Sequence, residues 1–259
     1  MDLSYWRKQT SEEPLFPDIL WSRPESKASS GKLAIIGGNA HGFSATGIAY
    51  NEALKSGVGI CRVLLPDAIK KTVRHVLPDA DYAPSTPSGS FSKKSLSELL
   101  STASWSDACL LAGNFGRNSE TAVVLEEFVK HHIGLLCVTQ DAADYFKTTP
   151  RLLLDRPNTL VVLSLAQLQK YFINMPIITP ITYSMTPLQL AEALHELTAD
   201  IKGLITVKHH DEIFVAFDGQ VVTVKNTDEI WRVKVSSRAT VFWLQNPSKI
   251  FEAIVSSLI

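Results

Sequence analysis

"KLAIIGGNAHGFSATGIAYNEALKSGVGICRVLLP", residues 32–66, contains two apolar runs separated by a Gly-Gly pair and an amphipathic stretch. Short, continuous apolar runs are typical of strands that are buried on both faces of a sheet. We therefore predict strands over Leu33–Ile36 and Ile60–Leu65, with a helix between them. In such a strand–loop–helix unit, the backbone amides of the loop can approach a phosphate group.

Apolar runs of the same kind recur along the chain and alternate with helical patterns. The runs predict further strands over Ala108–Ala112, Gly134–Val138, Leu160–Leu163 and Gly203–Val207. Because strand-like and helix-like units alternate, we predict an α/β fold with a doubly wound, mostly parallel sheet and helices on both faces.

Three of the helical patterns carry start signals. "NSETAVVLEEFVKHH" offers Asn118 as an N-cap, and its apolar residues fall at helical spacing. "TPLQLAEALHELT" opens with Thr186 as a cap and Pro187 at the first helical position. "NPSKIFEAIVSSLI" repeats that opening with Asn246 and Pro247. We expect a helix to begin at each of these places.

The order of elements changes near the C-terminal end. "GLITVKHHDEIFVAFDGQVVTV" predicts three strands in quick succession, the last two joined across Asp218-Gly219. Asp-Gly between apolar runs is a strong hairpin signal. We therefore expect antiparallel strands at the C-terminal edge of the sheet. Residues 83–95 are rich in Ser and Pro and predict a surface loop.

Length and composition are those of a globular protein with a sizeable core. The chain has 259 residues, of which 45% are hydrophobic and 20% charged. No internal repeat or shift in composition separates a second domain. We expect one domain over residues 1–259, in which residues 1–30 form an extended N-terminal segment that packs on the rest.

Charge and cysteine usage exclude several classes of partner. The 25 basic and 26 acidic residues give a net charge of -1 with no basic block, so we expect no nucleic-acid or membrane partner. No apolar run approaches the ~20 residues of a membrane span, and we expect a cytoplasmic protein. The cysteines lie in apolar runs and the adjacent histidine pairs lack a third ligand, so we expect no zinc site and assign no metal ligand.

Two glycine-bearing turns follow predicted strands. Gly37-Gly38 ends the first strand, and "LLAGNFGRNSE" carries Gly113 and Gly116 after another. Turns that leave the carboxyl ends of strands in one sheet border a common crevice, where open α/β sheets bind ligands. Two interpretations stay open: a phosphate or nucleotide site, or tight turns that need glycine for positive φ.

Four segments in this order resemble a known family. "RPESKASSGKLAIIGGN", "ALKSGVGICRV", "LLAGNFGRN" and "CVTQDAADYF" are similar to successive blocks of the NAD(P)H-hydrate dehydratase family, in the ribokinase-like superfamily. In that register Asn39 stands where the family has Ser, Asn114 where it has Pro, and Thr139 where it has a first Asp. Asp141 matches the second Asp, and Lys208 matches the lysine of a later Leu-Lys-Gly segment.

The resemblance implies a ribokinase-like fold and a nucleotide site. Family members repair hydrated NADH or NADPH, and ADP or ATP drives the removal of water. The implied cofactors are ADP or ATP and an NAD(P)H-type nucleotide, with Mg²⁺ as an open addition. The residues that the resemblance assigns to nucleotide binding are Gly37, Gly38, Asn39, Gly113, Asn114, Gly116, Asp141 and Lys208.

Two catalytic blocks of the family are missing from this chain. The family has a Gly-Thr-Gly-Asp segment that opens a late helix and supplies the base, but no glycine follows Gly219 here. Asp228 and Glu229 lie on a polar stretch that we interpret as a solvated loop. "VVLSLAQLQKYF" replaces a Thr-Pro-His-Pro-Gly-Glu block without its His or Glu.

We therefore assign no catalytic residue. The hypothesis is a dehydratase-like protein that binds a small-molecule nucleotide with reduced or no catalysis. Two alternatives stay open: an active dehydratase or small-molecule kinase, and a scaffold that binds no nucleotide. A homo-oligomer is compatible with each of these.

Overall fold

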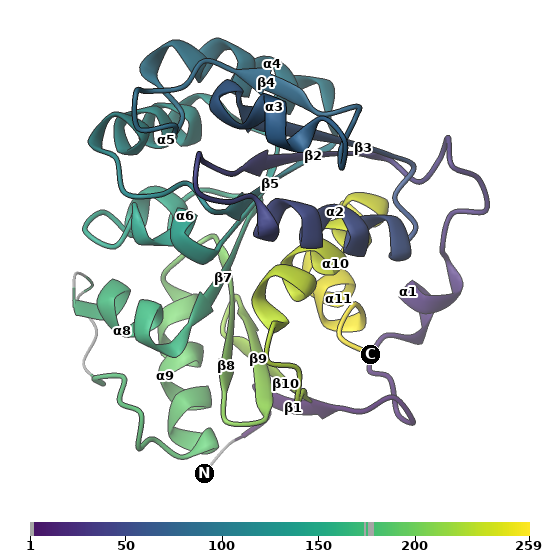
Figure 1. Ribbon diagram of the computed structural model, residues 1–259. Coiled ribbons are helices and arrows are strands. Elements are labelled where there is room, and N and C mark those ends of the chain that lie inside the picture. Colours follow the sequence, from purple (N-terminus) through teal and green to yellow (C-terminus); the bar gives the residue numbers. More distant parts are fainter. Residues whose placement is uncertain (1–2, 174, 176–178) are drawn as a thin grey trace.

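The strands predicted from apolar runs are all present in the computed structural model, which describes residues 3–173, 175 and 179–259. They belong to one ten-stranded sheet (Figure 1). Its strands are β1 (Trp6–Gln9), β2 (Lys32–Gly37), β3 (Ile60–Pro66), β4 (Asp81–Ala83), β5 (Ala108–Gly113), β6 (Leu135–Thr139), β7 (Thr159–Ser164), β8 (Leu204–His209), β9 (Glu212–Phe217) and β10 (Gln220–Lys225).

The sheet order is β1-β10-β9-β8-β7-β6-β5-β2-β3-β4. Neighbours from β4 through β8 are parallel, and β9 is antiparallel to both β8 and β10. This confirms the mostly parallel sheet with antiparallel strands towards its C-terminal side. Two short strands were not predicted. β4 has only three residues, and β1, with the sequence WRKQ, lacks an apolar run.

The helices fill the connections between strands. They are α1 (Pro17–Trp21), α2 (Ser44–Lys55), α3 (Lys70–Val73), α4 (Leu96–Trp105), α5 (Ser119–His131), α6 (Gln140–Asp144), α7 (Arg151–Leu154), α8 (Leu165–Ile173), α9 (Pro187–Ala199), α10 (Trp231–Gln245) and α11 (Ile250–Ser256). Two predicted caps are confirmed. The Asn118 side chain accepts the amides of Glu120 and Thr121, and Thr186 forms a capping box with Gln189.

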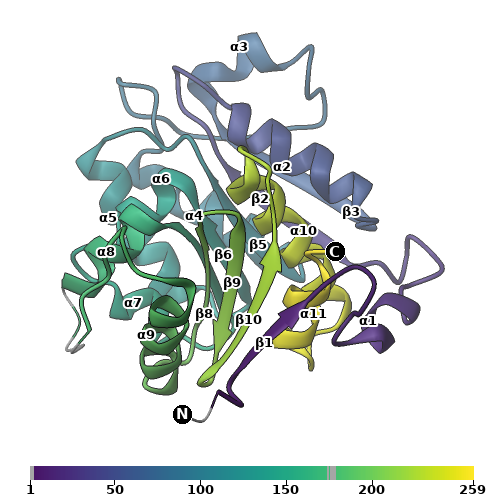
Figure 2. The same cartoon turned by 90° about the horizontal axis from the view of Figure 1, so that it is seen from below.

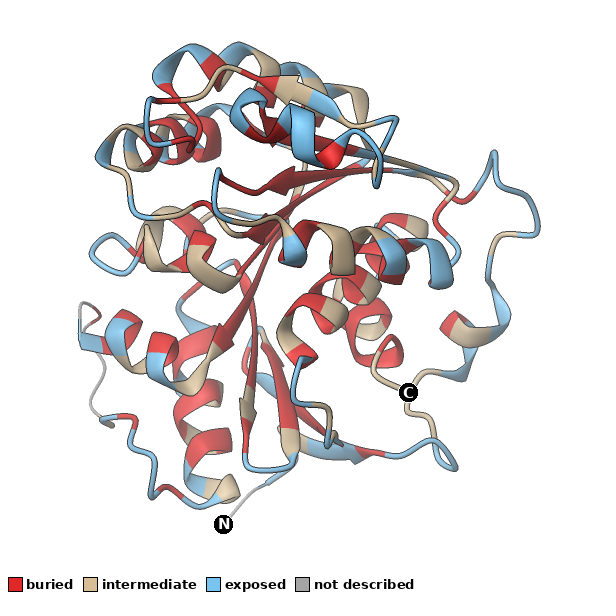
Figure 3. Ribbon diagram, viewed as in Figure 1, coloured by how far each residue is buried: buried red, intermediate tan, exposed pale blue. Residues whose placement is uncertain are grey.

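The hydrophobic core has two halves, one on each face of the sheet. Along β2, Ala34 and Ile36 belong to one half, while Leu33 and Ile35 belong to the other. Helices α4, α5, α8 and α9 cover the first face, and α2, α10 and α11 cover the second (Figure 2). Figure 3 shows the central strands buried between them. Helices on both faces are thus confirmed, and the central parallel strand β5 is buried along its whole length.

Helix α10 was not predicted from the sequence. Its sequence, WRVKVSSRATVFWLQ, has β-branched and small polar residues where an amphipathic helix would show an apolar stripe. The helix is enclosed between α2 and the sheet, so that Ser236, Ser237 and Thr240 are buried as well as Trp243. A helix buried on several sides has no simple periodic signal.

Two expectations need correction. The last helix begins at Ile250 and not at Pro247, because Asn246 closes α10 by donating its amide to the Trp243 carbonyl. Residues 83–95 are largely buried, since Phe91 enters the core and the Ser92 amide and hydroxyl both bind the Pro84 carbonyl. A Ser- and Pro-rich composition predicted the loop correctly but not its burial.

Residues 3–30 run along one edge of the sheet and across the second face. β1 lies parallel to β10, and α1 packs against α11 (Figure 1). The Arg23 guanidinium donates to the Ser56 carbonyl at the end of α2 and stacks on Phe242 of α10. Arg23, which opens the quoted stretch "RPESKASSGKLAIIGGN", therefore anchors residues 3–30 to the rest of the fold.

Candidate functional site

The two glycine turns meet at the carboxyl ends of adjacent strands. Gly37 of β2 pairs in register with Gly113 of β5, and the Gly38 amide donates to the Gly113 carbonyl at 3.0 Å. Asn39 Nδ2 donates to the Asn114 carbonyl. A Cβ on Gly37 would lie 2.5 Å from the Gly113 carbonyl oxygen, so this close approach requires glycine. The sequence correctly predicted that the two turns lie side by side.

The first glycine loop uses its own amides inside the protein. The amides of Asn39 and Gly42 donate to each other's carbonyls at 3.0 and 3.1 Å. The Ala40 amide donates to the Gly89 carbonyl at 2.9 Å, and the His41 amide donates to Asn39 Oδ1 at 2.7 Å. The contacts of this loop with a nucleotide stay a prediction. Because the amides of this loop already have acceptors, only its outer surface is available for contact with a ligand.

The Asn114 side chain accepts hydrogen bonds, which the proline of the family pattern cannot do. It adopts a φ of 61°, and its Oδ1 accepts the Ala45 amide at 2.8 Å and the Ser44 hydroxyl at 3.4 Å. These donors belong to the first turn of α2, so Asn114 caps that helix from a distant loop. The N-terminus of α2 is therefore closed by the protein itself.

Asp141 occupies the amides of the second glycine turn. It lies in the first turn of α6, and its Oδ2 accepts the Gly116 amide at 3.1 Å. Burial raises the pKa of this carboxyl, and hydrogen bonds from the backbone of residues 114–116 partly oppose the rise. A Cβ on Gly113 would meet Gln140 at 2.5 Å, so the turn and α6 are tightly packed.

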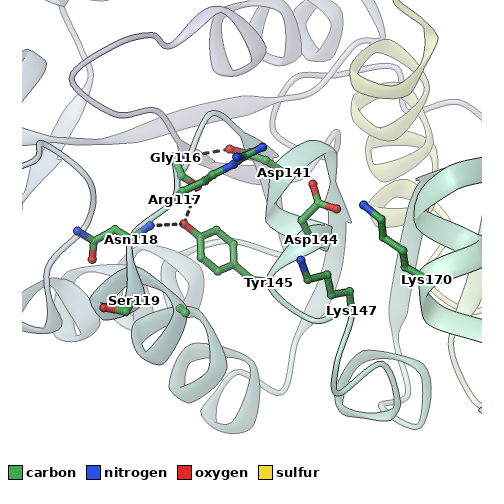
Figure 4. A pocket seen from close by; sticks show the side chains of 10 residues that line it. Gly116, Arg117, Asn118, Ser119, Asp141, Asp144, Tyr145, Lys147 and Lys170 are labelled. Carbon is green, nitrogen blue, oxygen red and sulfur yellow. Dashed lines mark hydrogen bonds between the residues drawn. The ribbon is translucent and has the colours of Figure 1, made fainter. Parts of the chain in front are cut away.

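A pocket of about 790 Å³ opens beside this turn. Figure 4 shows Asp144, Lys147 and Lys170 pointing towards one another across it. Tyr145 closes one wall, because its hydroxyl donates to the Gly116 carbonyl at 2.7 Å and accepts the Asn118 amide at 3.3 Å. The pocket is lined by Gly116, Arg117, Asn118, Ser119, Ala122, Asp141, Asp144, Tyr145, Lys147 and Lys170.

Of the predicted site residues, Gly116 and Asp141 line this pocket. The other glycines and the two asparagines do not line it and lie in the two turns. Sequence reasoning missed Lys147 and Lys170, because they lie outside the segments that carry the resemblance. Arg117, Asp144 and Tyr145 were within reach, since they belong to the "LLAGNFGRN" and "CVTQDAADYF" segments.

Lys208 stands apart from the glycine turns, on β8. Its ammonium group donates to the Asp228 carbonyl at 2.9 Å and to Asn226 Oδ1 at 3.5 Å. Its strand neighbour in register is Ser164, at the carboxyl end of β7. Lys208 thus faces the loop that leads into α10.

Arg232, in the first turn of α10, extends towards the same edge of the sheet. Its Nη1 donates to Gln167 Oε1 at 3.0 Å, and Gln167 Nε2 donates to the Gln140 carbonyl at 2.7 Å. Burial lowers the pKa of this guanidinium, while the negative charges of Asp144 and Asp141 raise it. Sequence reasoning missed Arg232 because it missed the helix that carries it.

In the described part of the chain, no three His, Cys, Asp or Glu side chains gather in a group that could hold a metal ion. Within the same residues no helix has both the length and the apolar character needed to cross a membrane.

Solved structures with the same architecture decide the fold. A ribokinase-like superfamily protein of Enterococcus faecalis V583 superposes with a TM-score of 0.74 at 16% sequence identity, covering 99% of this chain and 86% of that one. The chain has a ribokinase-like fold. An ADP/ATP-dependent NAD(P)H-hydrate dehydratase of Bacillus subtilis, co-crystallised with ATP and Mg²⁺, gives a TM-score of 0.64 at 12% identity, covering 90% of this chain and 79% of that one.

One curated relative adds a match in sequence. A bifunctional NAD(P)H-hydrate repair enzyme of Methanothermobacter thermautotrophicus is 33% identical over 101 residues, which are 39% of this ribokinase-like chain. The matched stretch spans only 19% of the length of that enzyme. No protein-family model matches the chain. The resemblance to NAD(P)H-hydrate dehydratases inferred from the sequence is confirmed.

Proposed function

We propose that this ribokinase-like protein binds an ADP/ATP or NAD(P)H-type nucleotide in the pocket beside Gly116 and Asp141, with reduced or no dehydration of hydrated NAD(P)H. The pocket supports binding of a phosphorylated ligand, because Arg117, Lys147 and Lys170 bring three cations to its lining. The Bacillus dehydratase of the same fold was crystallised with ATP and Mg²⁺.

The start of α10 carries the proposal of reduced catalysis. This is the late helix after the hairpin, where the resemblance implies an Asp as base. Asp228 precedes it here, and its carboxylate is 2.6 Å from Lys234 Nζ. The hydrogen bond from Lys234 holds the pKa of Asp228 below its usual value. A carboxylate stabilised in its charged form is a weak proton acceptor.

Mg²⁺ would fit this pocket only together with a phosphorylated ligand. It is usually held by one or two carboxylates and by phosphate oxygens. Asp144 lines the pocket, and Asp141 Oδ1 is buried without a hydrogen-bond partner among the described residues. These two carboxylates are the protein ligands that the pocket could offer to a cation bound by the nucleotide.

A second candidate is a working dehydratase or kinase that uses Asp141 as its base. The supporting observation is the raised pKa of that carboxyl, which makes it a better proton acceptor than Asp228. Against it stands the Gly116 amide, which already donates to Asp141 Oδ2.

The first prediction separates these functions in two assays on one preparation. Thermal unfolding is followed with ADP, ATP, NADH or NADPH, and dehydration of hydrated NADH with ADP or ATP is followed at 340 nm. We expect a raised Tm with at least one nucleotide, since a ligand at 100 times its Kd stabilises by ~2.7 kcal/mol. We also expect turnover no greater than that of the Asp141→Asn variant.

The control variant is Lys202→Gln, which removes an exposed cation ahead of β8 and outside the pocket. It should bind as the unaltered protein does, while Arg117→Gln should bind more weakly. Turnover that Asp141→Asn abolishes would establish the second candidate instead. A protein that shows neither binding nor turnover would be a scaffold.

A further inference from the structure

Residues 84–92 form a small hairpin that lies against both glycine turns. Ser85 and Phe91 make an isolated antiparallel bridge. Between them, the Thr86 amide donates to the Ser90 carbonyl at 2.8 Å, and the Ser90 amide donates back to Thr86 Oγ1 at 3.2 Å. A backbone that satisfies its own donors in this way keeps its shape without a ligand. We call this segment the 84–92 hairpin.

One side of the 84–92 hairpin closes the first glycine loop. The Gly89 carbonyl accepts the Ala40 amide at 2.9 Å, and a Cβ on Gly89 would lie 2.2 Å from the Ala40 Cβ. The two backbones are in direct contact at this point, which leaves no space for a ligand between them. The neighbouring residues of the loop, Gly38 and Asn39, are buried.

The other side of the 84–92 hairpin is fastened to the second glycine turn and to α5. Asn118 Nδ2 donates to Ser88 Oγ at 2.9 Å, and Thr121 Oγ1 donates to the carbonyl of the last core residue of the hairpin at 2.7 Å. A Cβ on Gly116 would lie 3.0 Å from Ser90 Oγ. The hairpin therefore bridges the two turns, and a ligand that extended from one turn to the other would have to displace it.

The pocket beside Gly116 lies clear of this bridge. Among the described residues that line the pocket, none belongs to the 84–92 hairpin or to the first glycine loop. Its volume of about 790 Å³ is ordinary for a small-molecule site. Arg117, Lys147 and Lys170 in its lining favour a terminal phosphate group over a bridging one, because a terminal phosphate carries more negative charge.

We propose that the 84–92 hairpin seals the first glycine loop, so that the pocket binds a mononucleotide such as ADP or ATP and excludes a dinucleotide such as NADH or NADPH. The inference rests on the proposed function and narrows its class of ligand. A dinucleotide that used both glycine turns would have to break the Ala40–Gly89 and Asn118–Ser88 hydrogen bonds. A mononucleotide held beside Gly116 breaks neither of them.

The experiment measures the Kd of ADP, NADH and NADPH by calorimetric titration of the unaltered protein and of Gly89→Ala. In the unaltered protein we expect Kd values for NADH and NADPH about 10- to 100-fold above that for ADP, as for the loss of two hydrogen bonds. Gly89→Ala pushes the hairpin away from Ala40, so the Kd for NADH should fall about 3- to 10-fold while that for ADP does not change.

Gly42→Ala is the matched control. It adds the same methyl group to the first glycine loop, where a Cβ would meet nothing within 4 Å, and all three Kd values should stay as in the unaltered protein. Hydrogen exchange of the Ala40 amide without ligand reports the seal directly, and it should be slow in the unaltered protein and faster in Gly89→Ala. If Gly89→Ala does not fold, Ser88→Ala replaces it, because it removes the hydroxyl that accepts Asn118.

Binding of NADH or NADPH as tight as that of ADP in the unaltered protein would overturn the inference and leave the proposed function standing. Fast exchange of the Ala40 amide in the unaltered protein would overturn the seal in the same way. Absence of binding of every nucleotide would overturn the proposed function, and the inference with it.

Discussion

Single side chains in this protein accept backbone amides that a loop would otherwise present to a ligand. Asn114 accepts the Ala45 amide in the first turn of α2, and Asp141 accepts an amide of the second glycine turn. The resemblance predicted the positions of both residues from the sequence. It could not predict their partners, because these come from segments 69 and 25 residues away. The candidate site is therefore predictable in its location but not in its hydrogen bonds.

The second prediction concerns Gly113. This residue has a φ of 114°, and an added Cβ would lie 2.5 Å from the Gln140 Cβ. We expect Gly113→Ala to lower the free energy of unfolding by roughly 1–3 kcal/mol, because it combines a strained backbone with a steric clash. Urea unfolding followed by circular dichroism measures this.

Gly47 provides the matched control. It lies inside α2, and a Cβ there would meet nothing within 4 Å. Gly47→Ala should raise the free energy of unfolding by about 0.5–1 kcal/mol, the helix preference for alanine. Equal effects of the two substitutions would show that the turn at Gly113 is not tightly packed.

The third prediction concerns Asp228. Because its pKa in the folded protein is below its ordinary value of 3.8, its pairing with Lys234 stabilises the fold above that pH and is lost as pH falls through the folded pKa. Lys234→Met should raise the pKa of Asp228 towards 3.8, measured by NMR titration of the side-chain carboxyl carbon. Lys202→Met should leave it unchanged. If the pKa of Asp228 did not change in Lys234→Met, Lys234 would not hold that pKa down, and Asp228 could then act as the base.

At the scale of elements, α10 and α2 form the contact that sequence patterns missed. The Ser237 hydroxyl donates to the Ala49 carbonyl at 2.6 Å, so two helix backbones approach closely. Next to it, Arg238 Nη2 lies 2.7 Å from Glu52 Oε1. Helices with one wet face, such as α5 and α9, were predictable from spacing and caps. α10 was not, because its small polar residues are buried by tertiary packing.

The fourth prediction tests this contact with Glu52→Gln. The substitution keeps the shape of a mostly buried side chain but removes its charge. We expect a loss of about 1 kcal/mol in the free energy of unfolding, a modest value because the Arg238 side chain keeps contact with water. Lys130→Gln removes solvent-exposed ion pairs with Glu126 and Glu127 and should change stability less. A larger loss of stability in Lys130→Gln than in Glu52→Gln would show that the Glu52–Arg238 ion pair does not stabilise the contact between α2 and α10.

At the scale of the whole molecule, the parallel half of the sheet was predictable because buried parallel strands have a direct signal of continuous apolar residues. The edges were not, since β1 and β4 are short and partly polar. Apart from the hairpin across Asp218-Gly219, apolar runs and turn signals do not say which strand lies beside which. The adjacency of the glycine turns followed instead from the general rule that ligands bind at the carboxyl ends of strands.

The pairing of β1 with β10 has a consequence for biosynthesis. Trp6 donates its indole N–H to Thr223, across 217 residues of sequence. On a ribosome that adds 5–20 residues per second, β1 emerges about 10 to 40 seconds before its partner exists. During that time the first strand has no neighbour in the sheet. The edge strand β1 therefore joins the sheet only after β10 has been made, late in the synthesis of this fold.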